Sequence, residues 1–217
     1  GLAATQYAKL GVQAEAKVST KYSFIQLMAG DAAVTGSGYI LTNDTGTYKV
    51  VLGTFGKGFN KTYSAAFAIV NSESNVKLRI TKIDFGTSDA IRPYAIVALH
   101  KTMSSNAFSD AAGAIVYYDK GTSYDYSDNG YVLRNGQGDY STGSLQYTNN
   151  GGTNWYTASW DATNVWVYNS TLTDATGLTT DTNTLANFVW VQITIDLTGA
   201  NDGTTLTGTL YIEVKSV

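Results

Sequence analysis

The sequence predicts an all-β fold, a β-sandwich or jelly roll, and three observations lead to it. Strand-forming residues (Val, Ile, Thr, Tyr, Phe, Trp) and turn-forming residues (Gly, Asn, Asp, Ser) dominate the chain. Short apolar or alternating runs recur with turn residues between them. Hydrophobic residues make up 43% of the 217 positions, which is enough for a packed core. This length suits one large β domain, and no linker separates two.

The first predicted element is an amphipathic strand at the N-terminus. Positions between its apolar residues are mostly polar, and a period of two predicts a half-buried strand. A helix fits less well, because the Leu and Val residues would scatter around its axis and Gly11 interrupts it. With Gln6 as the exception, the alternate positions are apolar: Leu2, Ala4, Ala8, Leu10, Val12, Ala14, Ala16 and Val18.

The length of this strand indicates a partner outside the domain. Residues 2–18 would span roughly 56 Å at ~3.3 Å per residue, whereas a usual strand has about five or six residues. An unpaired amphipathic strand at a chain end can insert into another molecule as a donor strand. Its small alanines would let it settle between two sheets, and such a head-to-tail contact generates a filament. The alternative is a strand paired inside its own sandwich.

The remaining strands are expected between turn signals such as Asn-Gly and Asn-Asp-Thr-Gly. The stretch 121–152 is polar and rich in Gly and Tyr, which predicts long surface loops around one or two short strands. The most regular pair, 187–197 and 204–215, is expected to form a hairpin around the loop 198–203. The other expected strands cover residues 39–41, 48–55, 63–70, 76–85, 94–99, 114–118 and 165–168.

Two passages of the chain are similar to a known family. The first runs from residues 59–63 (Phe-Asn-Lys-Thr-Tyr) through 70–72 (Val-Asn-Ser) to 76–78 (Val-Lys-Leu). The second runs from 188–193 (Phe-Val-Trp-Val-Gln-Ile) through the loop 198–203 to 208–212 (Gly-Thr-Leu-Tyr-Ile). They resemble an early strand, turn and strand, and the closing hairpin, of the TasA-like (camelysin-group) biofilm-matrix filament proteins and their archaeal relatives that build bundling pili and threads.

The resemblance implies a jelly-roll pilin whose N-terminal strand completes the sheet of its neighbour in an extracellular filament, used in biofilm or cell adhesion. It suggests residues 1–20 as donor strand and 21–217 as sandwich domain. The camelysin name also carries a reported metalloprotease activity. His100 is the only histidine and His-Glu-x-x-His is absent, so a histidine-based zinc site cannot be assembled.

Several other residues suggest binding sites, each with a plainer interpretation. Asn43, Asn60 and Asn169 fit the N-glycosylation pattern, or are ordinary turns and strand ends. The alternative function is that of a carbohydrate-binding sandwich, in which aromatic side chains form a platform that stacks on sugars. The same side chains could equally pack in the core; they are Trp155, Tyr156, Trp160, Trp166, Tyr168 and Trp190. A further group of residues could supply oxygen ligands to calcium, or could be ordinary solvated side chains of loops: Asp119, Asp125, Asp128, Asn129 and Asp139.

Composition and motifs argue against catalysis and several classes of partner. The only glutamates are Glu15, Glu73 and Glu213, in different predicted elements, and there is no Gly-x-Ser-x-Gly. We expect no catalytic residue, metal or cofactor. The net charge of −3 argues against nucleic acid, and no apolar run approaches the ~18 residues of a membrane span. The expected partners are identical subunits in a helical polymer, and neighbouring filaments or cells.

The expected location is extracellular. The chain begins at Gly1 without a basic segment followed by an apolar one, and we interpret it as a secreted form after signal removal. Its low charge and abundant hydroxyl and amide side chains are common in surface proteins. It has no cysteine, so no disulfide secures the fold.

Overall fold

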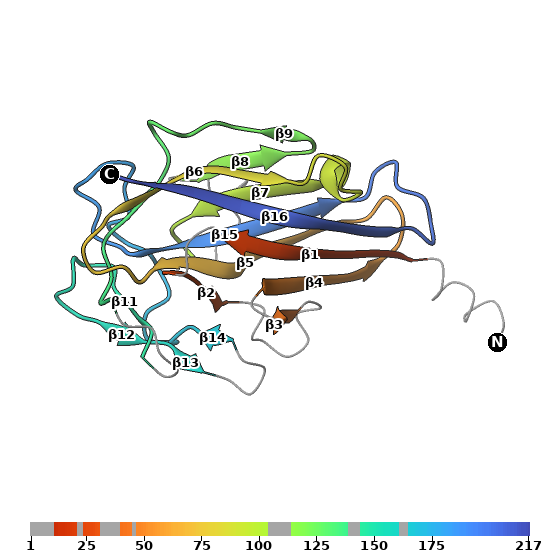
Figure 1. The fold of residues 1–217 in the computed structure, drawn as a ribbon. Helices are drawn as coiled ribbons and strands as arrows, with labels where there is room; N and C mark the ends of the chain where they lie inside the picture. The colour runs from red at the N-terminus through yellow and green to blue at the C-terminus, as the bar shows by residue number, and fades with distance from the viewer. Residues whose placement is uncertain are drawn as a thin grey trace.

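The computed structural model describes residues 11–20, 24–30, 40–44, 47–103, 114–138, 144–160 and 165–217. Within these ranges the regular elements are β-strands, apart from one 3₁₀ turn at Arg92–Tyr94. The all-β prediction is confirmed (Figure 1). Leu2, Ala4, Ala8 and Leu10 of the predicted donor strand lie outside the described residues, as does Asp139.

Within the described residues, the long strands lie in two sheets that pack around a shared apolar core. We call them the β1 sheet and the β15 sheet. In spatial order, the β1 sheet contains β10 (Val132–Leu133), β6 (Leu78–Phe85), β16 (Thr205–Ser216), β1 (Val12–Thr20), β4 (Thr47–Phe55) and β3 (Ile40–Asp44). The β15 sheet contains β13 (Ser159–Trp160), β14 (Trp166–Val167), β2 (Ile25–Ala29), β5 (Asn60–Asn71), β15 (Phe188–Asp196), β7 (Ala95–His100), β8 (Ile115–Asp119) and β9 (Thr122–Ser123). A separate pair joins β11 (Gln146–Tyr147) to β12 (Tyr156–Thr157).

Eight of these strands are arranged as a jelly roll. In chain order they are β4, β5, β6, β7, β8, β10, β15 and β16. The chain alternates between the sheets except for β7 and β8, which are neighbours in the β15 sheet. In such a jelly roll β4 and β16 would be adjacent strands. Here β1 lies between them as an added strand (Figure 1).

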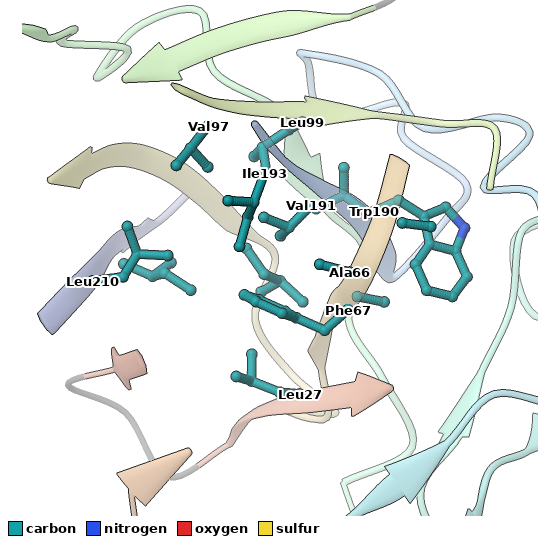
Figure 2. Close-up of a cluster of buried hydrophobic side chains, with 14 of the residues drawn as sticks. Leu27, Ala66, Phe67, Val97, Leu99, Trp190, Val191, Ile193 and Leu210 are labelled. Carbon is teal, nitrogen blue, oxygen red and sulfur yellow. The ribbon is translucent and has the colours of Figure 1, made fainter. Parts of the chain in front are cut away.

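Apolar side chains from both sheets meet in one cluster. Figure 2 shows Leu210 of β16 directed toward the same space as Phe67 of β5 and Ile193 of β15. All three are at most 2% exposed. The cluster therefore lies between the β1 sheet and the β15 sheet, and it forms the floor beneath β1.

The predicted hairpin of β15 and β16 is wrong. β15 pairs with β5 and β7, and β16 pairs with β1 and β6, so residues 198–203 cross from one sheet to the other. The burial patterns explain the difference: β15 is buried from Phe188 to Ile195, whereas β16 alternates over much of its length. A strand buried on both faces belongs in the middle of a covered sheet.

The prediction of surface loops over 121–152 is also wrong in part. The segment contains several short strands, and it contributes side chains to the core, each at most 2% exposed: Tyr131, Val132, Leu133, Leu145 and Tyr147. These apolar residues are too widely spaced along the chain to show the period of a strand. Their burial shows that the segment is part of the sandwich.

Candidate intersubunit site: the slot between β4 and β16

The candidate site is the space between β4 and β16, which we call the β1 slot. β1 fills it and pairs on both sides. Its pairing with β4 is antiparallel, from Val12 opposite Phe55 to Val18 opposite Tyr48. With β16 it is parallel, from Gln13 opposite Thr205 to Thr20 opposite Ile212. The two walls of the slot run in opposite directions, so any strand in it must be parallel to one wall and antiparallel to the other.

The described side chains of β1 follow the predicted alternation. Ala14 and Ala16 are 2% and 3% exposed, whereas Gln13 is exposed and Glu15 is partly exposed. Val12 and Val18 lie in β1, and their side chains are outside the described part of the chain. The inward face of the slot thus accepts small apolar side chains at two consecutive inward positions.

A β-bulge shapes the β4 wall. Ala14 lies opposite Gly53 and Glu15 opposite Val51, so Leu52 is the extra residue. Gly53 has φ of 108°, which glycine adopts without strain. The carbonyl of Leu52 accepts a buried hydrogen bond of 2.6 Å from the hydroxyl of Tyr63. Because Tyr63 is in β5, this bond ties the wall of the slot to the β15 sheet.

The β16 wall is supported by the segment that follows β6. The Ile91 N–H donates to the Thr207 carbonyl at 3.2 Å, and the Thr209 N–H donates to Asp89 Oδ2 at 2.8 Å. Between them, Gly208 lies opposite Ala16. A Cβ atom on Gly208 would lie 2.6 Å from Ile91 Cγ2, so the close packing here requires glycine.

Charged residues flank the slot on its outer face. Lys49 of β4 forms an ion pair of 3.3 Å with Glu15, and both side chains are about one third exposed (32% and 39%). Such a pair contributes little, about 0–1 kcal/mol. In the backbone register, Lys49 lies opposite Lys17.

Both walls end where β1 begins. Val12 lies opposite Phe55, the last residue of β4, and Gln13 lies opposite Thr205, the first residue of β16. The apolar alternation of the sequence continues upstream to Leu2. At this end β4 does not extend beyond Phe55, and β16 does not begin before Thr205. We call this end, where the turn 56–59 and the loop 198–203 lie, the loop end.

The opposite end of the sandwich holds the start of β2. Thr20 lies opposite Ile212 there, and Ile25 begins β2 opposite Asn71. We call this end the hinge end. β16 continues beyond Ile212 to Ser216, and no residue of β1 pairs with these last positions. The β16 wall is therefore longer at the hinge end than β1.

The predicted aromatic platform is divided between core and surface. Trp166 and Trp190 are 2% and 0% exposed and cannot stack on a sugar. Trp160 packs edge-on against Trp166, with ring centroids 4.7 Å apart. Trp155, Tyr156, Trp160 and Tyr168 are partly buried. The six residues therefore do not form one exposed surface.

The three predicted glycosylation sites differ in their surroundings. Asn60 is exposed at the first position of β5. Asn169 is partly buried, and its Oδ1 accepts a hydrogen bond of 2.9 Å from the Thr171 N–H. Asn43 lies in β3, with its side chain outside the described residues. Of the two described side chains, that of Asn60 is the accessible one.

The described residues give no support to the other candidate sites. Across these ranges, no three His, Cys, Asp or Glu side chains gather in a way that could hold a metal ion. Asp125 instead accepts hydrogen bonds from Ser127, which lower the pKa of its carboxyl group. The same ranges contain no helix long and apolar enough to cross a membrane.

Neither a scan against protein-family models nor a search of curated proteins found a match to this chain. Function is therefore inferred from the residues and contacts of the β1 slot.

Proposed function

We propose that this chain is the structural subunit of an extracellular filament, in which residues 1–20 of one copy occupy the β1 slot of the next copy. One observation carries the proposal: β1 is an added strand between β4 and β16 of an otherwise complete jelly roll. A slot that accepts a terminal strand of this chain can accept the same strand from a second copy. Exchange of an identical element between copies is a low-cost route to assembly.

The length of the N-terminal pattern supports exchange. Residues 12–20 pair in the chain's own sheet, which is the alternative considered from the sequence. In the sequence, the alternation continues upstream from Leu10 to Leu2, before the first residues that pair with the walls. An amphipathic segment longer than the ladder of β1 is suited to pairing with another molecule. The intramolecular β1 is then a closed form of the subunit.

The extracellular setting and the role in biofilm or adhesion follow from sequence features. Low charge, abundant hydroxyl and amide side chains and the resemblance to TasA-like filament proteins favour a secreted subunit. An exposed Asn60 is compatible with a glycan at that position. The partners in this proposal are identical subunits.

Deletion of residues 1–20 tests the proposal. We expect the shortened chain to form no filaments by electron microscopy and to elute as a single subunit in size exclusion. Gln13→Ser in the full-length chain is the matched control, because Gln13 is exposed and its substitution should leave filaments intact.

A competition experiment tests the proposal even if the shortened chain does not fold. An excess of synthetic peptide 1–20, added to full-length subunits before assembly, should occupy free slots and shorten the filaments. A peptide with Ala14 and Ala16 both replaced by Asp should have no effect, because these positions face the core. Filaments formed by the shortened chain would disprove the proposal.

A further inference from the structure

We infer that the N-terminal segment runs in opposite directions in its two positions: parallel to β16 in its own slot, and antiparallel to β16 in the slot of a neighbouring copy. This inference rests on the proposed function. It concerns how the donor strand enters the slot, and three features of the fold support it.

The first feature is the short connection from β1 to β2. β1 ends at Thr20 and β2 begins at Ile25. Five residue steps span at most ~18 Å when fully extended. Both residues lie at the hinge end, where their partners are Ile212 and Asn71. In an exchanged assembly, this connection must link the slot of the acceptor to the hinge end of the donor.

Exchange in the same direction would close the assembly. Thr20 of the donor would lie at the hinge end of the acceptor, while Ile25 lies at the hinge end of the donor itself. The short connection would hold two hinge ends side by side. Two copies can then exchange their N-terminal segments around a two-fold axis. Both slots of the resulting dimer are filled, so no further copy can be added.

Exchange in the reverse direction leaves the assembly open. Thr20 of the donor then lies at the loop end of the acceptor, so the hinge end of one copy meets the loop end of the next. The same contact can be repeated by every copy added. A repeated head-to-tail contact that does not close gives a filament.

The second feature is the end of β16 beyond Ile212, which pairs with β6 but not with β1. Keeping Glu15 opposite Thr207, as in the chain's own sheet, the reversed segment places Leu10 opposite Ile212 and Ala8 opposite Val214. Residues 6–17 then pair with the whole of β16, from Thr205 to Ser216. The upstream apolar positions thereby gain a partner in β16, whose ladder with β1 begins at Gln13 in the chain's own sheet.

A period of two makes this reversal possible. Because side chains alternate along a strand, the residues that face the core can still face it when the strand runs in the opposite direction. The inward positions of β16 at the hinge end are Ile212 and Val214, which are 2% and 8% exposed. The reversed register sets them against Leu10 and Ala8, which are apolar positions of the segment.

The third feature is the charge pattern along β4. In the chain's own slot Lys17 lies opposite Lys49. Keeping Glu15 opposite Val51, reversal places Gln13 opposite Lys49 and Lys17 opposite Thr54. The register then no longer pairs lysine with lysine, an unfavourable pair of residue types, and Glu15 remains in the position from which it pairs with Lys49. The reversed strand is thus the better match for the outer face of the slot.

Cysteine cross-linking distinguishes the two directions, because the chain has no cysteine of its own. The loop-end variant combines Gln13→Cys with Thr54→Cys, two exposed positions that face each other in the chain's own slot. The hinge-end variant combines Gln13→Cys with Lys49→Cys. Within a single chain, residue 13 is displaced by four residues along the strand from the position opposite residue 49, which is ~13 Å. A disulfide cannot bridge two Cα atoms more than ~7 Å apart. Gln13→Cys alone is the control for random coupling.

Each variant is assembled, oxidised and run on a denaturing gel without reductant. We expect the hinge-end variant to give a ladder of covalent multimers, and the loop-end variant to give cross-linked monomers only. Covalent dimers from the loop-end variant, with no ladder from the hinge-end variant, would overturn the reversal but leave exchange into the slot intact. Filaments in which neither variant gives intermolecular products would overturn both the reversal and the proposed function.

Discussion

At the scale of single residues, the β1 slot depends on side chains that are small and on one backbone conformation. Ala14 and Ala16 leave room for β1 above the apolar floor, and Gly208 allows the 86–91 segment to approach β16. Gly53 provides the positive φ of the bulge. None of these residues has a side chain that takes part in acid–base or nucleophilic chemistry. The site is therefore defined by its shape and by the backbone hydrogen-bonding groups of β4 and β16 that pair with β1.

The alternation of the sequence was sufficient to predict that Ala14 and Ala16 face inward. It could not predict the bond of Tyr63 to Leu52, because that bond crosses from one sheet to the other, or the bond of Asp89 to Thr209, because 120 residues separate the two. Gly53 did carry a signal, since glycine inside a strand pattern often marks a bulge. Its consequence for the slot required the register of β1 with β4.

Replacing Gly53 by alanine should destabilise the fold. At φ of 108° an alanine is strained, and we expect a loss of about 1–3 kcal/mol in the free energy of unfolding. Gly56→Ala is the control, because Gly56 has no positive φ and a Cβ there would meet no atom within 4 Å. Urea unfolding of the two variants measures the difference. Equal free energies of unfolding for the two variants would show that a side chain at position 53 does not strain the bulge.

Replacing Ala16 by aspartate should prevent the segment from occupying any slot. The position is 3% exposed, and an unpaired carboxylate there costs more than ~2 kcal/mol. We expect no filaments by electron microscopy and a lower urea midpoint. Gln13→Asp introduces the same charge at an exposed position of β1 and should assemble normally. Normal assembly of the Ala16→Asp variant would contradict the inward placement.

At the scale of elements, the long strands were predictable and their pairing was not. Residues 48–55, 63–70, 94–99 and 187–197 were predicted within a few positions of β4, β5, β7 and β15. A turn between two regular strands can join neighbours in one sheet, as in a hairpin, or cross from one sheet to the other. The sequence does not distinguish these connections, which is why β15 and β16 were wrongly paired. Strands of two residues, such as β9 and β10, are too short to show any period.

β1 should open more easily than the central strands of the sandwich. It is followed by one short connection to β2, whereas β5 and β15 lie in the middle of the β15 sheet and β15 is buried from Phe188 to Ile195. Exchange requires β1 to leave its slot without global unfolding. In native-state hydrogen exchange of unassembled subunits, we therefore expect the amides of residues 13–20 to exchange at least ~10-fold faster than those of β15. Equal protection of both strands would contradict an exchangeable β1.

At the scale of the whole molecule, composition and periodicity predicted the sandwich, and the jelly-roll order emerged only from the structure. Nothing in the pattern of residues 2–18 shows which two strands they separate. The position between β4 and β16 depends on strand pairings across most of the chain. Likewise, the loop-rich segment 121–152 could not be assigned to the core, because residues distant in sequence cover its side chains: Tyr147, for example, packs against Phe188 and donates a hydrogen bond to the Leu172 carbonyl.

Buried tyrosines should make the fold sensitive to alkali. Burial raises the pKa of Tyr63 and Tyr131 to about 12, and it also raises the pKa of Tyr117 and Tyr147 above the ordinary value of 10.0. Above pH 10 the unfolded chain loses protons that the folded chain retains. The stability is therefore complete below pH 10 and is lost as pH rises toward 12 and beyond.

The expected loss is at least ~2 kcal/mol between neutral pH and pH 12. Urea midpoints across this range measure it, and tyrosinate absorbance should rise together with unfolding. A midpoint that stays constant while the buried tyrosines ionise would show that their hydroxyl groups do not support the fold.

The most direct measurement of strand exchange is an electron cryomicroscopy map of the assembled filament that resolves the β1 slot and the connection to Ile25. We predict that the strand between β4 and β16 continues into β2 of a neighbouring copy and runs antiparallel to β16. A strand that continues into β2 of the same copy, or subunits that form no filament under any assembly condition, would contradict donor-strand assembly.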